Sequence, residues 1–143
     1  LVGSEMCIRD RLSFGQKRRL GVAAALALNP RILILDEITN GQDALEKERM
    51  MEYLKAINEQ RGITIVLISH DMDIVRRFAK RVLVLHRGNK VFDDTPKTLF
   101  NGEYPVERWG LCHPTVSSLS AALGIDAVTP AEFVAAVERK GGK

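Results

Sequence analysis

The chain has 143 residues, of which 45% are hydrophobic and 27% charged, and its formal net charge is +3. These values are ordinary for one soluble globular domain with a small appendage. No apolar run approaches the roughly 20 residues of a membrane span. The basic residues are scattered, so no nucleic-acid partner is expected. The two cysteines, Cys7 and Cys112, form no CxxC pair, so a disulfide framework is not expected either.

The first predicted element is a helix at residues 14–28. Ser13 is a suitable N-cap for it, and Asn29-Pro30 is a suitable stop. The run Ile32-Leu33-Ile34-Leu35 is short and continuously apolar. Such a run predicts a strand that is buried on both faces, as in a parallel sheet.

The next predicted helix spans residues 43–60, and Arg61-Gly62 provides its C-terminal stop. Its apolar residues fall on one face, which is formed by Met50, Leu54 and Ile57. A second buried strand is predicted at residues 63–68, and a short helix at 71–79. A third strand, at 82–85, continues through a turn into Val91-Phe92, which predicts a hairpin at the sheet edge.

Glycines and prolines punctuate the chain beyond residue 93. The pattern predicts four short helical pieces, at residues 95–100, 104–111, 114–123 and 130–139. We predict that residues 104–143 form a helical appendage. The alternation of strands and helices before it is the α/β pattern.

Polar residues follow the first two strands. Asp36 and Glu37 come after the first, and His70 comes after the second. In open α/β sheets, ligands bind at the carboxyl ends of the strands. A carboxylate there can hold Mg²⁺ through water, and a second one can orient or deprotonate a water. Taken alone, the pair is equally well explained as a capping Asp and a surface Glu.

The segment Leu12-Ser13-Phe14-Gly15-Gln16 opens the first helix. A hydroxyl and free backbone N–H groups at a helix N-terminus form an anion site. Taken alone, an ordinary N-cap explains this segment better, and a satisfied histidine explains His70 better.

Four motifs occur in a particular order in this chain: residues 12–16, Ile32 to Glu37, Asn40 to Asp43, and Ser69-His70-Asp71. They resemble the signature motif, the Walker B strand with its catalytic Glu, the D-loop and the H-loop of ABC ATPases. The resemblance covers residues 12–93 and implies an incomplete P-loop NTPase domain. Its sheet would be mainly parallel with an edge hairpin, and a helical appendage would follow.

The resemblance also implies roles for single residues. Asp36 would serve the Mg²⁺ of bound MgATP, Glu37 would be the general base, and His70 would contact the γ-phosphate. The signature residues would touch the γ-phosphate of ATP held by a partner subunit in a head-to-tail dimer; these are Ser13, Gly15 and Gln16. Asp43 would link the two sites of that dimer.

The departures from the family pattern are also specific. The sequence has no G-x-x-x-x-G-K-[ST] motif, so a Walker A loop is lacking. Residues 1–11 do not resemble the family and suggest a non-native leader on a truncated gene product, which alone would be inactive. Ile38 stands where the family usually has Pro.

The Phe variant of the signature, the Gly41-Gln42-Asp43 sequence and the tail around Trp109 are similar to the ATPases of energy-coupling factor transporters. This resemblance implies an ATP-hydrolysing subunit of an importer for a vitamin or transition-metal ion. The subunit would lie at the cytoplasmic face of the membrane, with a second ATPase subunit and transmembrane subunits as partners. The alternatives are a soluble ABC ATPase without a transport role, and a non-catalytic dimerisation module.

Overall fold

The computed structural model describes residues 11–125, 127 and 130–141. In this part of the chain, two compact units are divided between Ser69 and His70. The predicted leader, residues 1–11, lies outside the described residues except for Arg11. None of the described helices is both long and apolar enough to cross a membrane.

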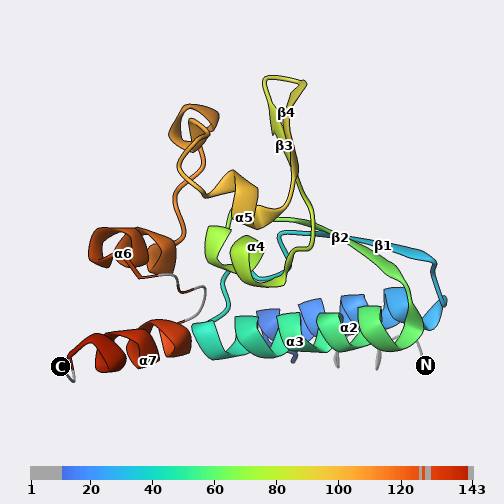
Figure 1. Ribbon diagram of the computed structural model, residues 1–143. Coiled ribbons are helices and arrows are strands. Elements are labelled where there is room, and N and C mark those ends of the chain that lie inside the picture. The colour runs from blue at the N-terminus through green and yellow to red at the C-terminus, as the bar shows by residue number, and fades with distance from the viewer. Residues whose placement is uncertain (1–10, 126, 128–129, 142–143) are drawn as a thin grey trace, which may run out of the picture. The chain divides into compact units, whose positions relative to one another are not determined.

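The first unit has two helices and a parallel pair of strands. Its elements are α2 (Phe14–Ala27), β1 (Ile32–Asp36), α3 (Ala44–Arg61) and β2 (Thr64–Ile68). β1 and β2 run parallel, with Ile32 opposite Thr64 and Asp36 opposite Ile68. The carboxyl ends of both strands therefore meet at the same edge, as the sequence predicts. Figure 1 shows α2 and α3 on one side of this sheet.

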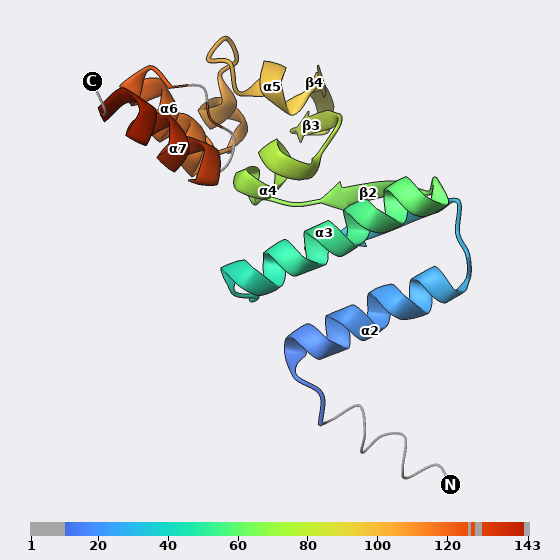
Figure 2. The same cartoon turned by 60° about the horizontal axis from the view of Figure 1, so that its bottom comes forward.

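The β1–β2 sheet is covered on one face. In β1, Leu33 and Leu35 are buried, whereas Ile32 and Ile34 are 61% and 65% exposed. Neighbouring side chains of a strand point to opposite faces, and Figure 2 shows α2 and α3 on the same side of the strands. The prediction that both strands are buried on both faces is therefore wrong. An apolar run does not reveal whether the chain supplies a cover for each face.

The helix ends of the first unit follow from local sequence. Ser13 accepts the N–H of Gln16, and the Gln16 side chain accepts the N–H of Ser13, which forms a capping box. α3 ends at Gly62, whose φ of 65° is a left-handed conformation that glycine adopts at little cost. The predicted apolar face of α3 is buried, since Met50, Leu54 and Ile57 lie in the core.

The second unit begins with a helix and a hairpin. These elements are α4 (Met72–Phe78), β3 (Val82–His86) and β4 (Asn89–Asp94), and the two strands are antiparallel with an irregularity between Val84 and Leu85. The hairpin confirms the prediction. The described residues thus form two separate two-stranded sheets, whereas the sequence predicts one mainly parallel sheet.

Four short helices complete the second unit: α5 (Pro96–Leu99), the 3₁₀ helix η1 (Val106–Trp109), α6 (Thr115–Leu123) and α7 (Pro130–Gly141). Its main core combines the hairpin with the segments on either side, through Met72, Val84, Phe92, Leu99, Phe100 and Val106. Tyr104 adds an edge-to-face contact with Phe92, at 4.9 Å between ring centroids. The tail around η1 therefore packs against the hairpin.

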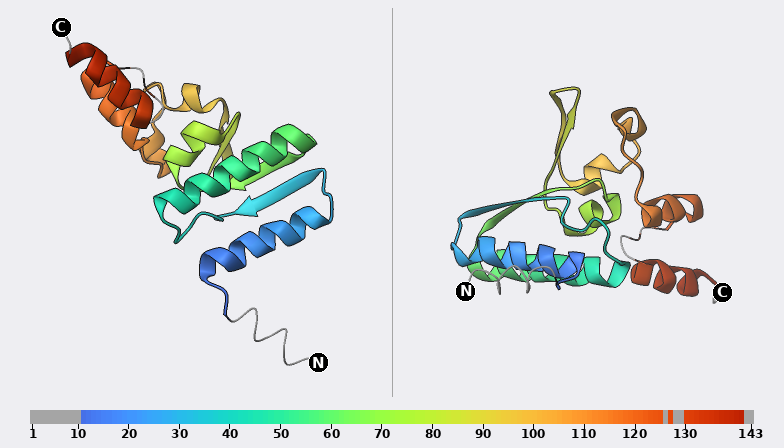
Figure 3. Two further views of the ribbon diagram at one scale, coloured as in Figure 1. Left: turned by 90° about the horizontal axis from the view of Figure 1, so that it is seen from below. Right: turned by 180° about the vertical axis from the view of Figure 1, so that it is seen from behind.

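Side-chain hydrogen bonds connect α6 to α4 and to the segment that follows α6. The carboxylate of Asp73 on α4 accepts hydrogen bonds from the backbone N–H and the hydroxyl of Thr115, at 3.0 and 3.1 Å. The hydroxyl of Ser120 donates to the carbonyl of Ala127, at 3.3 Å. Figure 3 shows α6 beside α7 in both views.

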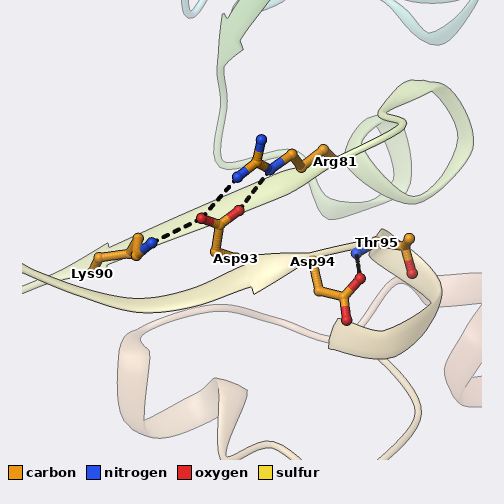
Figure 4. Close-up of polar contacts among 5 residues, drawn as sticks. All are labelled: Arg81, Lys90, Asp93, Asp94 and Thr95. Atoms are coloured by element: carbon orange, nitrogen blue, oxygen red, sulfur yellow. Dashed lines mark hydrogen bonds and ion pairs between the residues drawn. The ribbon is translucent and has the colours of Figure 1, made fainter.

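Three charged side chains meet on the surface of the hairpin (Figure 4). Arg81 donates two hydrogen bonds to the carboxylate of Asp93, at 2.7 and 3.0 Å, and Lys90 donates a third at 2.9 Å. The hydrogen bond from Arg81 is the main cause that lowers the pKa of Asp93 from 3.8 to about 2, followed by that from Lys90. The same contact raises the pKa of Arg81.

We expect Asp93→Asn to remove a pH-dependent part of the stability. The folded pKa of Asp93 lies below its ordinary value, so its contribution is complete above about pH 3.8 and is lost as the pH falls through about 2. The melting temperature of the unchanged chain should exceed that of Asp93→Asn at pH 5. The difference should shrink towards zero between pH 4 and pH 2, as followed by circular dichroism. A difference that stays constant over this range would contradict the assignment.

Candidate functional site

The two predicted catalytic carboxylates lie at the end of β1. Asp36 is the last residue of the strand and is exposed, whereas Glu37 is half-buried. The N–H of Glu37 donates to the carbonyl of Ile68 at 3.0 Å, so the chain beyond β1 stays attached to the end of β2. The two neighbouring carboxyl groups therefore have different surroundings, which is what different chemical roles require.

The backbone of Glu37 has an unusual conformation. Its φ is 48°, in the left-handed region that residues other than glycine seldom adopt. Its carbonyl accepts hydrogen bonds from the N–H of Asn40, at 3.2 Å, and from Nη1 of Arg18, at 2.7 Å. Such strain, of order 1–3 kcal/mol, persists where surrounding contacts hold it, and it clusters at functional sites.

The predicted signature residues surround the N-terminus of α2. The side chains of Ser13 and Gln16 are exposed, and each forms one half of the capping box. The Ser13 hydroxyl uses an oxygen lone pair in this cap and keeps a proton to donate. A Cβ on Gly15 would lie 3.2 Å from Oε2 of Glu46, so a carboxylate from the first turn of α3 lies close to this helix end.

Asp43 is the N-cap of α3. Its carboxylate accepts the N–H of Glu46 at 2.8 Å. The helix therefore begins one residue later than the sequence predicts, because an N-cap residue has a non-helical backbone. The predicted role of Asp43 across a dimer stays a proposal.

Replacement of Asp43 should measure its contribution to stability as an N-cap. Asp43→Ala loses the cap and should lower the free energy of unfolding by about 1 kcal/mol, whereas Asp43→Asn keeps a good cap and should stay close to the unchanged chain. Urea denaturation followed by circular dichroism measures both. Equal stability of all three chains would show that the cap contributes nothing.

His70 is exposed and is the first residue of the second unit, whereas all the other predicted site residues belong to the first. Within the first unit, the signature segment lies close to the loop that follows β1. The ring of Phe14 lies 3.8 Å from the point where a Cβ on Gly41 would be.

The predicted metal ligand can be tested against the donors present. Among the described residues, no cluster of three or more His, Cys, Asp or Glu side chains could hold a metal ion. Mg²⁺ needs no such cluster, because it keeps several waters and is bound by one or two carboxylates together with substrate phosphates. The single exposed carboxylate of Asp36 fits this mode of binding.

Two residues of this region were not predicted from the sequence: Arg18 and Glu46. The sequence shows Arg18 only as part of the basic run Lys17-Arg18-Arg19. Its spacing of four from Phe14 was the available signal, because residues i and i+4 of a helix are neighbours. The proximity of Glu46 to Gly15 has no counterpart in the sequence pattern.

The fold and these motifs define the class: the described residues correspond to part of an ABC-type ATP-binding cassette. Residues 3–40 match the family model described as ABC transporter. The matched range includes residues 3–11, for which no resemblance was predicted.

Individual relatives agree with this class. EcfA2, an energy-coupling factor transporter ATP-binding protein of Clostridium tetani, is 39% identical over 112 residues, which cover 78% of this chain and 39% of the relative. The methionine import ATP-binding protein MetN of Bartonella henselae is 44% identical over 100 residues, or 70% of this chain and 29% of the relative.

Solved structures resemble the chain as well. The structure of cbiO1 from Clostridium perfringens, part of the ABC transporter complex cbiONQ, matches with a TM-score of 0.62 and 34% identity, over 79% of this chain and 45% of that one. The cassette MJ0796, in a dimeric post-hydrolysis state bound to ADP and Pi, matches with a TM-score of 0.56 and 36% identity, over 61% of this chain and 37% of that one.

These matches confirm the resemblance drawn from the motifs: the chain is a homologue of ABC transporter ATP-binding proteins. It spans less than half the length of the relatives and solved chains named here.

Proposed function

We propose that this chain is part of the ATP-hydrolysing subunit of an ABC-type importer. The observation that carries the proposal is the end of β1, where an exposed carboxylate, Asp36, is followed by Glu37 in a left-handed conformation held by backbone and side-chain contacts. Two identical or related subunits would bind MgATP head to tail, and hydrolysis would drive transport by transmembrane subunits. The protein would lie at the cytoplasmic face of the membrane.

Each site residue would have a distinct role in the hydrolysis of ATP. The Glu37 carboxylate would accept a proton from a water whose oxygen attacks the γ-phosphorus of ATP. The bond from that phosphorus to the bridging oxygen would break, with ADP as leaving group. Bound Mg²⁺ supplies charge neutralisation on the phosphate oxygens, and Asp36 would orient it through water. His70 would donate a hydrogen bond to the γ-phosphate.

The N-terminus of α2 would serve the nucleotide held by the partner subunit. The dipole of a helix favours an anion at its N-terminus, and the Ser13 hydroxyl has a proton to donate. Closure of the dimer would bring Ser13, Gly15 and Gln16 to the γ-phosphate, and Asp43 would connect the two sites. Similarity to an energy-coupling factor transporter ATP-binding protein supports an ABC importer, and the motif resemblance to that group leads us to propose a vitamin or transition-metal ion as the transported substrate.

A chimaera tests this function. The 112 residues of this chain that align with EcfA2 of Clostridium tetani would replace the matching segment of that relative. We expect Mg²⁺-dependent release of phosphate from ATP by the chimaera, measured at steady state, and no turnover by the 143-residue chain alone, because its sequence lacks a phosphate-binding loop. A well-folded chimaera without turnover would contradict the proposal.

A non-catalytic module is the second candidate. It is favoured by one observation: the capping box of α2 is complete, and the two side chains that form it are exposed. In that case the chain would supply its α2 N-terminus to a complete partner and stimulate the turnover of that partner. Addition of the 143-residue chain to a cassette with a disabled signature motif distinguishes the two functions.

A further inference from the structure

The side chain of Arg18 connects three parts of the first unit. Its Nη1 donates to the carbonyl of Glu37 at 2.7 Å and to the carbonyl of Asn40 at 2.6 Å. Its guanidinium lies 4.4 Å from the centroid of the Phe14 ring, one turn earlier in α2. The Arg18 guanidinium therefore bridges the first and last carbonyls of the turn formed by residues 37–40, and it stacks on the Phe14 ring of the signature segment.

The carbonyl that Arg18 binds belongs to the strained residue of the site. Glu37 has a φ of 48°, and its carbonyl also accepts the N–H of Asn40 at 3.2 Å. A left-handed conformation is unfavourable for a side-chain-bearing residue unless its surroundings hold it. The direction of the Glu37 side chain depends on this backbone conformation, so the contact from Arg18 influences where the carboxylate points.

Phe14 completes the connection. Its ring lies under the Arg18 guanidinium and also 3.8 Å from the point where a Cβ on Gly41 would be. The φ of Gly41 is 71°, so a larger residue there would be strained as well as in contact with the ring. The N-terminus of α2 and the loop after β1 are therefore held together by Arg18 and Phe14.

We infer that Arg18 is a positioning residue for the candidate general base Glu37, and that it links this base to the signature end of α2. The inference rests on the proposed function. Arginine suits the position because a planar guanidinium can donate to carbonyls in its plane while it stacks on an aromatic ring. Lysine could still reach one carbonyl, but it stacks less well, so a partial rescue is expected from Arg18→Lys.

The first arm of the experiment uses the 143-residue chain itself. Amide hydrogen exchange at Asn40, whose N–H donates to the Glu37 carbonyl, reports whether the turn stays closed. We expect exchange about tenfold faster in Arg18→Met than in the unchanged chain, with Arg18→Lys in between. Lys17→Met is the matched control, because it removes a positive charge from the neighbouring exposed position of the same helix. The amide of Val22 in α2 should be unaffected in every variant.

The second arm measures turnover in the chimaera with EcfA2. We expect Arg18→Met to lower kcat by about tenfold or more, because small displacements of a reacting group have large effects on rate. The KM for ATP should stay within about twofold, Arg18→Lys should recover part of kcat, and Lys17→Met should change neither constant. A purely structural role would instead lower the active fraction and leave no graded rescue.

The outcomes separate the two proposals. Unchanged Asn40 exchange in a folded Arg18→Met chain, or unchanged kcat in the chimaera, would overturn the role of Arg18. If the chimaera without substitutions has no turnover, the proposed function fails, and the exchange arm still decides whether Arg18 holds the turn.

Discussion

Glu37→Gln is expected to lower kcat of the chimaera by about 10²- to 10⁴-fold, the range that a positioned general base contributes. Glutamine has the same shape and can hold a water, but it cannot accept the proton. The KM for ATP should change little, since Glu37 would act on the water. Release of phosphate under saturating MgATP is the measurement.

The control for this substitution is Glu59→Gln, which removes the charge of an exposed glutamate on α3. It should leave kcat within about twofold of the unchanged chimaera. If Glu37→Gln also retained turnover within that range, Glu37 would not be the base, and the left-handed conformation of this residue would need another explanation.

The second large effect concerns stability. Leu99 in α5 is completely buried within the core of the second unit. Leu99→Ala should lower the free energy of unfolding by about 2–5 kcal/mol, because it removes a buried side chain and leaves a cavity. The single tryptophan, Trp109, packs against this same core, so its fluorescence reports urea unfolding of the unit.

Leu85→Ala is the matched control, since Leu85 on β3 is 67% exposed. The change in its free energy of unfolding should stay within about 0.5 kcal/mol. Equal losses from Leu85→Ala and Leu99→Ala would mean that the described core does not determine the stability of this unit.

The ends of the elements were the most predictable part of the fold, because their causes lie within a few residues. Ser13 caps α2, and Gly62 ends α3 in a left-handed conformation. Burial was less predictable. The run at residues 32–35 is apolar throughout, yet its alternate side chains are exposed, because burial depends on which other segments cover the sheet.

The same distinction applies to the candidate site. Asp36 and Glu37 were predicted at a strand end because adjacent residues and an apolar run suffice for that prediction. The contact from Arg18 joins residues 19 apart in sequence, and it depends on how α2 packs beside β1. The left-handed backbone of Glu37 was not predicted either, since a glutamate carries no local signal for it.

The one-sided cover of the β1–β2 sheet has a thermodynamic consequence. Unfolding raises the heat capacity in proportion to the apolar surface that becomes newly hydrated. The apolar side chains on the open face are already 42–65% exposed in the folded chain; these are Ile32, Ile34, Val66 and Ile68. The first unit should therefore unfold with a smaller heat-capacity change and a smaller urea m-value than a unit of equal length with two covered faces. Its stability curve should be correspondingly flat with temperature.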